Sequence, residues 1–330
     1  MDISVTVPSL PGPGMTVLGS GARFSPGGKG GNQAVAAARL GAEVEMVGCV
    51  GDDAFSPQLL ADLRAEHVGT DHVRVIPGTP SGLAMIAVDS SAENLIVVAP
   101  GANREVSPAD VAAAHPADVI VISAEIPVPA ITAALTHPSW ALRILNLAPV
   151  PPDAAAIIAE HADRLDWLVV NESEAAALLD NPDHSPASPT PAAPTPAAPT
   201  PAAPTPTDPT DPTDPPTRAL QAAAQAAAAL VTRGARHAVV TAGAHGAALA
   251  GPEGTHTIPG FKVQAVDTVG AGDTFVGALA VALAAGVPAP EAVRAAAAAG
   301  AAAVTRQGAQ TAMPDTSDIL AVTGLKWPLT

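Results

Sequence analysis

Cysteine and aromatic residues are scarce in this chain of 330 residues. Cys49 is the only cysteine, which excludes an intrachain disulfide and a cysteine-rich metal site. Aromatic residues make up 2% of the chain, so Val, Ile, Leu and Ala have to fill the core. Hydrophobic residues nevertheless reach 48%, which is ample for a core, and the length of the chain suits one large α/β domain or two small ones. The lack of a disulfide predicts a cytoplasmic protein.

Basic residues are also few. The chain has 15 Lys and Arg against 31 Asp and Glu, and its formal net charge is -16. We therefore expect no nucleic-acid and no membrane partner, because a nucleic acid and an anionic membrane both require a basic surface. An anionic nucleotide is not excluded, since the backbone amides of one local site can bind phosphate.

Long uninterrupted apolar runs are missing as well. The nearest candidate spans residues 275–290, and it is bounded by Asp273 and Glu291, so we interpret it as a buried helix followed by a turn. The N-terminus has neither the basic flank nor the apolar run of a signal peptide. We expect neither a signal peptide nor a membrane span.

Proline is abundant in one segment, residues 181–216. Its sequence repeats TPAAP three times from Thr190 and TDP three times from Thr207. Frequent proline removes backbone donors, and little apolar bulk is present to bury. We expect a disordered Pro/Ala/Thr-rich insertion in a single domain that spans residues 1–330. A docking segment for a partner is the alternative.

Elsewhere, short apolar runs alternate with Ala-rich helical stretches. The expected strands are Val44–Val50, Val119–Ser123, Arg143–Leu147, Trp167–Val170 and Ala238–Thr241, and the expected helices are Gln33–Leu40, Arg218–Leu230 and Glu291–Val304. This alternation predicts an α/β fold with a mostly parallel sheet covered by helices. Leu83–Val88 and Asn94–Val98 predict a hairpin apart from that sheet.

Four polar motifs interrupt these elements. Gly27-Gly28-Lys29-Gly30-Gly31-Asn32-Gln33 offers bare backbone ahead of a helix, but lacks the spacing of a Walker A loop. Asn171-Glu172-Ser173-Glu174 follows an expected strand, and it suits either water-mediated Mg²⁺ binding or a helix N-cap with acidic first-turn residues. The third motif, Val239-Val240-Thr241-Ala242-Gly243-Ala244-His245-Gly246, is either a nucleotide-binding turn or a hairpin, with His245 more typical of a turn residue than of a catalyst.

The fourth motif is Asp267-Thr268-Val269-Gly270-Ala271-Gly272-Asp273-Thr274-Phe275. One interpretation is a loop in which Asp273 caps a helix. The other is an anion hole, in which the amides of Gly270, Ala271 and Gly272 and the positive end of the helix face a phosphoryl group. Asp273 would then take the proton of an attacking alcohol.

In this order, the four motifs resemble the PfkB-type carbohydrate kinases, and most closely the ribokinases among them. Residues 27–53 resemble the N-terminal signature of the family, residues 267–279 its C-terminal signature, and Asn171 with Glu174 its Asn-x-x-Glu motif. The end of the chain, Val304 to Gln310, is also similar. The resemblance covers nearly all of the chain except the Pro-rich segment. It implies a ribokinase-like three-layer sandwich with a small β lid formed by residues 3–24 and 81–100.

The resemblance also implies roles for individual residues. Asp273 is the expected base, with Gly270, Ala271 and Gly272 as anion hole. The sugar is expected to contact Asp2, Gly28, Lys29, Gly30, Gly31, Asn32, Glu125 and Asp273. ATP is expected to contact Asn171, Thr241, Ala242, Gly243, Ala244, His245, Gly246, Gly272 and Asp273.

Two ions and a homodimer are further implications of the resemblance. Glu174 is expected to organise Mg²⁺ through water. An activating K⁺ is expected at Asp267, Val269, Ala303, Arg306, Gly308 and Ala312, largely through carbonyl oxygens. Ala312 departs from the serine of the family pattern, which puts one ligand in doubt. Lids of two subunits are expected to pair, which would cover the exposed strand edges of the hairpin.

The start of the chain departs from the family pattern. Family members open with an apolar strand ending in Gly-Ser-x-Asn-x-Asp, whereas this chain opens with Met1-Asp2-Ile3, in which Asp2 matches the final Asp. We therefore expect that the first central strand is missing from this chain and that Met1 is an internal methionine of a longer protein.

The leading interpretation is ATP-dependent phosphorylation of D-ribose at its 5-hydroxyl. Lys29 and the Gly-Ala-Gln sequence at residues 308–310 favour ribose. The alternatives are a kinase of the same family acting on deoxyribose, fructose or adenosine, and a catalytically impaired sugar-binding homologue that lacks the N-terminal strand.

Overall fold

The computed structural model describes residues 1–89, 94–180 and 214–328. Its main sheet has six strands in the order β14-β13-β12-β11-β10-β9. The strands β9 to β12 are parallel, and β13 and β14 continue the sheet antiparallel. Their bounds are Ala117–Ser123, Trp140–Asn146, Trp167–Asn171, His237–Thr241, Gly246–Gly251 and Gly254–Pro259 for β9 to β14. The expected mostly parallel sheet is confirmed.

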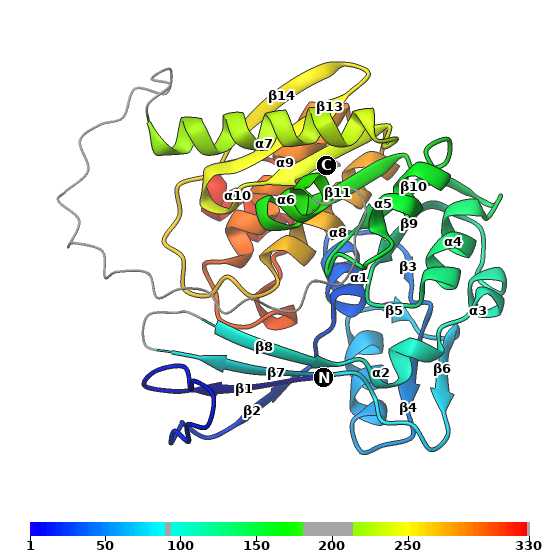
Figure 1. The fold of residues 1–330 in the computed structure, drawn as a ribbon, viewed down its shortest axis with the longest axis vertical. Helices are drawn as coiled ribbons and strands as arrows, with labels where there is room; N and C mark the ends of the chain where they lie inside the picture. Colours follow the sequence, from blue (N-terminus) through cyan, green and yellow to red (C-terminus); the bar gives the residue numbers. More distant parts are fainter. Residues whose placement is uncertain (90–93, 181–213, 329–330) are drawn as a thin grey trace.

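Alternating side chains of the central strands face two separate cores. Leu168 and Val170 of β11 belong to one apolar cluster, and Trp167 and Val169 to the other, because successive residues of a strand point to opposite faces. The first cluster includes residues of α3 Pro108–Ala112, α4 Val128–Thr136, α5 Ala154–Glu160, α6 Glu172–Asp180 and α7 Pro215–Thr232. The second includes residues of α1 Lys29–Arg39, α8 Ala271–Ala284, α9 Ala289–Ala303 and α10 Thr316–Thr323. The result is the expected three-layer sandwich (Figure 1).

A second sheet lies apart from this sandwich, at the lower left of Figure 1. It has four strands in the order β2-β1-β7-β8, with bounds Arg23–Ser25, Asp2–Thr6, Leu83–Val88 and Asn94–Ala99. Strands β7 and β8 form the expected hairpin, paired antiparallel. The segments expected in the lid, residues 3–24 and 81–100, both contribute to this sheet. We call it the lid sheet.

Shorter elements complete the fold. They are β3 Val44–Glu45, β4 Gly48–Gly51, α2 Ser56–Ala65, β5 Val68–Gly69, β6 Val73–Ile76 and the 3₁₀ turns η1 Gly101–Glu105, η2 Gly243–His245 and η3 Gln310–Ala312. The prediction of one strand over Val44–Val50 is wrong. The segment divides because β3 pairs with β5, whereas β4 pairs with β6 in a separate ribbon.

Two further boundaries differ from expectation. Helix α1 begins at Lys29 rather than at Gln33, so Gly30, Gly31 and Asn32 are helical. Helix α7 begins at Pro215, because proline fits the first turn of a helix, where its missing N–H has no partner to lose. The last two residues of the predicted insertion are therefore helical, and residues 181–213 lie outside the described part.

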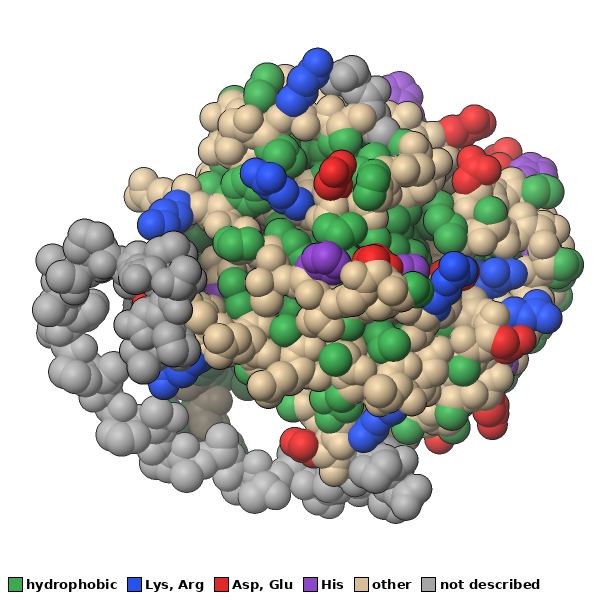
Figure 2. Space-filling model, turned by 90° about the horizontal axis from the view of Figure 1, so that it is seen from above, with side chains coloured by type: hydrophobic (Ala, Val, Ile, Leu, Met, Phe, Trp, Pro, Cys, Tyr) green, Lys and Arg blue, Asp and Glu red, His purple; other side chains and the backbone are tan. Residues whose placement is uncertain are grey.

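In the described part of the chain, the main sheet ends at β9, and no further strand lies beyond that edge. The expectation of an additional strand upstream of Met1 stays a prediction. No helix among the described residues is both long and apolar enough to cross a membrane. On the face shown in Figure 2, basic side chains lie scattered among acidic and apolar ones instead of forming one patch.

Candidate active site

Asp273 lies in the first turn of α8 and is buried, with 8% of its surface exposed. Gly270, not Asp273, occupies the N-cap position, so the interpretation of Asp273 as a helix cap is wrong. Gly270 has φ of 76°, a conformation that favours glycine, and a Cβ there would lie 3.1 Å from Cα of Ala309. Amides in the first turn of a helix have no partner within the helix, and in α8 the amide of Ala271 donates to the carbonyl of Thr268 at 3.3 Å.

Two amide side chains hold the Asp273 carboxylate. Asn32 Nδ2 donates a hydrogen bond to Asp273 Oδ2 at 2.8 Å, and Gln33 Nε2 donates to Asp273 Oδ1 at 3.2 Å. Gln33 Nε2 also donates to Asn146 Oδ1 at 3.0 Å, and Asn146 Nδ2 donates to the carbonyl of Val169 at 3.0 Å. The network therefore ties the carboxylate of α8 to α1, to the end of β10 and to the middle of β11.

Gln33 and Asn146 were missed as site residues by the sequence analysis. Gln33 was assigned only to the end of a glycine motif, and Asn146 to an apolar strand. A signal was present for Asn146, because it is a polar residue at the carboxyl end of a parallel strand, where α/β folds place ligands. No comparable signal marks Gln33, whose role depends on the packing of α1 against α8.

Three further carboxylates surround Asp273. Burial raises the pKa of Asp273, and burial is also the main cause of the raised pKa values of Asp2, Glu125 and Glu174. The negative charge of Asp273 raises each of these three further, whereas Lys29 opposes the shift at Glu125, Glu174 and Asp273. These residues, predicted from four separate segments, therefore share one electrostatic site.

The glycine motif supports this site in two ways. A Cβ at Gly27 would overlap the Asp2 carboxylate at 2.0 Å, so Gly27 lets the lid sheet approach the start of α1. Gly28 has φ of 89° and is the N-cap of α1. The amide of Lys29, the next residue, donates a hydrogen bond to Glu125 Oε2 at 3.0 Å. Gly30 and Gly31, in contrast, face packing neighbours, Met46 and Gln310. Their contact with a sugar stays a prediction.

Asn171 and Glu174 form a reciprocal pair at the start of α6. The amide of Glu174 donates to Asn171 Oδ1, and the amide of Asn171 donates to Glu174 Oε2, both at 2.8 Å. This arrangement is a capping box built on Asn in place of Ser or Thr. The N-cap interpretation of the motif is therefore confirmed, and Mg²⁺ binding by Glu174 stays a prediction.

The third motif is a hairpin. Strand β12 turns through η2 into antiparallel β13, and Gly260 donates to the carbonyl of His245 at 2.8 Å. Thr241 and Asn171 are register partners on adjacent strands, so the two expected nucleotide-binding segments lie side by side. A Cβ added at Gly272 would meet no heavy atom within 4 Å, so the backbone there is open to a ligand.

The expected K⁺ residues also converge. The Asp267 carboxylate accepts hydrogen bonds from the amides of Val269 and Gly308, at 3.0 Å and 2.9 Å. It thereby joins the segment before α8 to the segment after α9. The Arg306 side chain forms an ion pair with Asp318, so only its backbone is available to an ion. Ala312 is buried and offers no side-chain oxygen.

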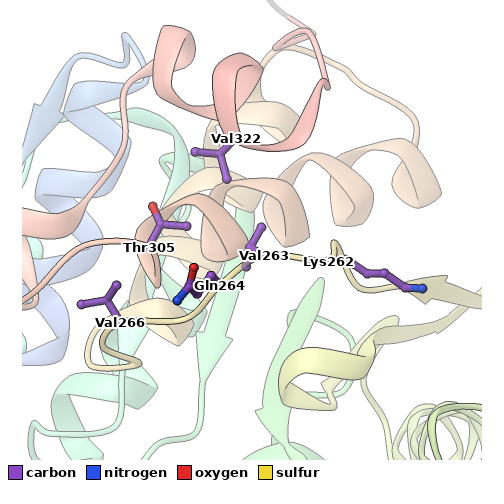
Figure 3. Close-up of a pocket in the computed structure, with 6 residues that line it drawn as sticks. All are labelled: Lys262, Val263, Gln264, Val266, Thr305 and Val322. Carbon is purple, nitrogen blue, oxygen red and sulfur yellow. The ribbon is translucent and has the colours of Figure 1, made fainter. Parts of the chain in front are cut away.

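A surface hollow of about 440 Å³ lies beside the loop between β14 and α8. Its lining residues are Lys262, Val263, Gln264, Val266, Thr305 and Val322, and none was predicted as a site residue. Figure 3 shows Val322 of α10 facing the loop that carries Val263, with the Lys262 side chain pointing away from Val266. The hollow is lined mainly by the segment that leads from β14 to α8, with Thr305 and Val322 from the C-terminal part of the chain.

Comparison with known proteins agrees with this geometry. Residues 1–316 match the model of the pfkB family of carbohydrate kinases. A ribokinase of Bacillus subtilis is 35% identical over 325 residues, which cover 97% of this chain and 94% of that protein. A ribokinase of Schizosaccharomyces pombe is 34% identical over 332 residues, with 96% and 93% covered.

Solved structures give the same result. The ribokinase of Arabidopsis thaliana complexed with ribose and ATP superposes with a TM-score of 0.73 at 26% identity, covering 98% of this chain and 96% of that one. The family signatures, the sandwich and the lid sheet are thus found together over nearly the whole length. This chain belongs to the pfkB family of carbohydrate kinases.

Proposed function

We propose that this chain transfers the γ-phosphoryl group of ATP to the 5-hydroxyl of D-ribose, with Asp273 as the base. The observation that carries the proposal is the buried Asp273 in the first turn of α8, beside the amides of Gly270, Ala271 and Gly272. The similarity to curated ribokinases at 34–35% identity supports ribose as the substrate.

In the proposed step, the sugar oxygen bonds to the γ-phosphorus while the bond from that phosphorus to the bridging oxygen of ADP breaks. The hydroxyl proton passes to the Asp273 carboxylate. The raised pKa of Asp273 brings its proton affinity nearer to what a general base needs. The α8 amides and the positive end of the helix stabilise charge on the moving phosphoryl group.

The buried polar groups around Asp273 suit a polyhydroxylated ligand. Asn32 Oδ1 is a buried acceptor with no hydrogen-bond partner, although Nδ2 of the same side chain is paired with Asp273. A sugar hydroxyl can donate to it and remove the cost of an unpaired acceptor. The carboxylates of Asp2 and Glu125 supply further acceptors beside it.

ATP would lie across the hairpin Thr241–Gly246, with its phosphates toward Gly272. The open backbone at Gly272 supports this placement, as does the hollow between Gly260 and Asp267, whose valines can cover the nucleoside. Glu174 would organise hydrated Mg²⁺, which neutralises phosphate charge. K⁺ would be held by the carbonyls of the residues predicted for it and would support the anion hole through Gly270, which packs on Ala309.

The exposed apolar residues of the lid sheet support a homodimer. Four consecutive residues of β8, Leu95 to Val98, are each 43–53% exposed, so both faces of that strand carry uncovered apolar side chains. One face can close over the sugar, and the other can pair with a second copy of the chain. The single cysteine supports a cytoplasmic location.

A coupled assay of ADP release tests the activity. Ribose, deoxyribose, fructose and adenosine are compared with ATP, Mg²⁺ and K⁺ present. We expect ribose to have the highest kcat/KM. If another substrate has a higher kcat/KM, that substrate takes the place of ribose in the proposal. If ribose binds without turnover, the result favours a sugar-binding protein that is not a kinase.

A further inference from the structure

Glu45, His72 and His115 form a compact cluster outside the candidate active site. Each residue offers one ligand atom, and these atoms all lie within 4.8 Å of one another. Glu45 ends β3, His72 lies between β5 and β6, and His115 lies between α3 and β9. The cluster thus draws one side chain from each of three separate segments.

The cluster is far from Asp273. His115 precedes β9, and the active-site residue Glu125 follows it. A strand rises about 3.3 Å per residue, so the seven residues of β9 separate the two ends by roughly 20 Å. His115 is therefore remote from the residues predicted to bind sugar and nucleotide.

The three side chains of the cluster do not satisfy one another's hydrogen-bonding groups. His115 Nδ1 lies 2.7 Å from Glu45 Oε1, but His72 Nε2 lies 3.7 Å from Glu45 Oε2, too far for a hydrogen bond. The His72 nitrogen is buried and has no hydrogen-bond partner. The two imidazole rings are perpendicular, at 82°, with centroids 4.8 Å apart. The unpartnered His72 nitrogen thus lies close to a carboxylate and to a second imidazole.

We propose that Glu45, His72 and His115 bind Zn²⁺, with water completing the coordination. Two imidazoles and one carboxylate are a ligand set that zinc prefers, whereas Mg²⁺ and Ca²⁺ prefer oxygen ligands alone. A tetrahedral zinc ion holds its ligand atoms roughly 3.3 Å apart, given bonds of about 2.0–2.2 Å. The separations of 2.7 Å and 3.7 Å, which involve different oxygens of Glu45, lie on either side of that value, and the ligand atoms would have to close up from at most 4.8 Å.

The three ligand atoms would have to move slightly to surround one ion, and the differing exposure of the two histidines suits such a movement. His72 is anchored, because its carbonyl accepts a hydrogen bond from the amide of Gly48 at 3.3 Å and only 17% of its side chain is exposed. The His115 side chain is 68% exposed and can rotate toward the other two residues. Bound zinc would fasten the turn before β9 to β3 and to the segment before β6.

Calorimetric titration of the full chain with ZnCl₂ tests the proposal, with Co²⁺ absorption as a second readout. We expect one equivalent to bind in the wild type, with the visible spectrum of a four-coordinate Co²⁺ ion. His115→Ala should weaken this binding at least about tenfold, and it should fold normally because the side chain is largely exposed. Saturating Zn²⁺ should raise the Tm of the wild type by about 3–5 °C, and that of the variant by less.

His256→Ala is the matched control, because His256 also lies beside a glutamate, with Nε2 3.3 Å from the carbonyl of Glu253. It should bind zinc as the wild type does. Equal affinity of the wild type and His115→Ala would overturn the proposal, since the ion would then bind elsewhere, for example at the active-site carboxylates. Absence of binding, or binding of Mg²⁺ in place of Zn²⁺, would overturn it too.

Discussion

Asn32 of α1 donates a 2.8 Å hydrogen bond to Asp273 of α8, although 241 positions separate the two residues in the chain. The same amide leaves its own Oδ1 buried and unpaired. One side chain therefore orients the proposed base and also presents an acceptor to the ligand. This relationship shows why the two glycine motifs, which lie near opposite ends of the chain, have to be considered together.

Replacement of the proposed base should abolish most of the activity. We expect Asp273→Asn to lower kcat by about 10²–10⁴-fold, because the amide cannot take the hydroxyl proton. In the wild type, the acidic limb of kcat/KM should lie above pH 3.8, the ordinary carboxyl pKa, because burial raises the pKa of Asp273. Steady-state kinetics at several pH values measure kcat of the variant and the acidic limb of the wild type. Asp153→Asn, an exposed residue before α5, is the control, and equal kcat values for the two variants would exclude Asp273 as base.

Gln33 should act as a positioning residue. Gln33→Leu removes a donor to the Asp273 carboxylate, so the pKa of that carboxyl should rise further. The acidic limb of the kcat profile should therefore move to higher pH. Gln58→Leu, on the exposed surface of α2, should leave the profile unchanged. An unshifted limb in Gln33→Leu would show that the glutamine has only a structural role.

Gly272 and Gly277 should respond oppositely to alanine. At Gly272 a Cβ meets open space, so Gly272→Ala should stabilise α8 by about 0.5–1 kcal/mol while lowering kcat/KM for ATP at least about tenfold. At Gly277 a Cβ would lie 2.6 Å from the carbonyl of Gln33, so Gly277→Ala should lower stability. Urea unfolding measures the stability of the two variants, and steady-state kinetics measure their kcat/KM for ATP. Full activity of Gly272→Ala would mean that phosphate does not approach this turn.

The Arg74–Asp110 ion pair should contribute to stability above about pH 4. The Arg74 guanidinium lowers the pKa of Asp110 from 3.8 to about 2. A lowered carboxyl pKa gives stability that is complete above the unfolded value and is lost as the pH falls through the folded value. Arg74→Met should therefore cost about 1 kcal/mol at pH 7, a modest amount because the Arg74 side chain is half exposed, and the cost should shrink towards pH 2.

Urea unfolding at pH 7, 5 and 3 measures this dependence. Arg164→Met, which removes an exposed pair with Asp163, is the control and should have a small effect at every pH. A cost that stays constant between pH 7 and pH 3 would contradict the assigned pKa of Asp110.

A charge on the lid sheet should separate the proposed dimer. Ile96 of β8 is 51% exposed, and Ile96→Lys should convert a dimer into monomers, because the lysine would have to be desolvated in the interface. Val75→Lys is the control, since Val75 is 49% exposed on β6, outside the lid sheet. Light scattering with size-exclusion chromatography gives the masses. A wild-type chain that is monomeric at micromolar concentration would refute the dimer.

Much of the fold follows from local pattern. The apolar runs of the central strands and the Ala-rich helices are periodic signals that depend on near neighbours, and they predicted these elements to within a few residues. The run at residues 44–50 was assigned wrongly because a short apolar segment does not reveal where its pairing partner changes. The start of α1 was placed too late because its glycines suggested a loop.

Local sequence was enough to predict the family signatures, the alternation that produces the sandwich and the glycine turn before α8. Each depends on residues close together in the chain. Packing between distant segments brings Gln33 to Asp273, joins Asn146 to them, and buries Asp2, Glu125, Glu174 and Asp273 so that their pKa values rise. Only the tertiary structure brought Glu45, His72 and His115 together. The physical reason is that distance and burial depend on how separate segments pack, and no local pattern encodes that packing.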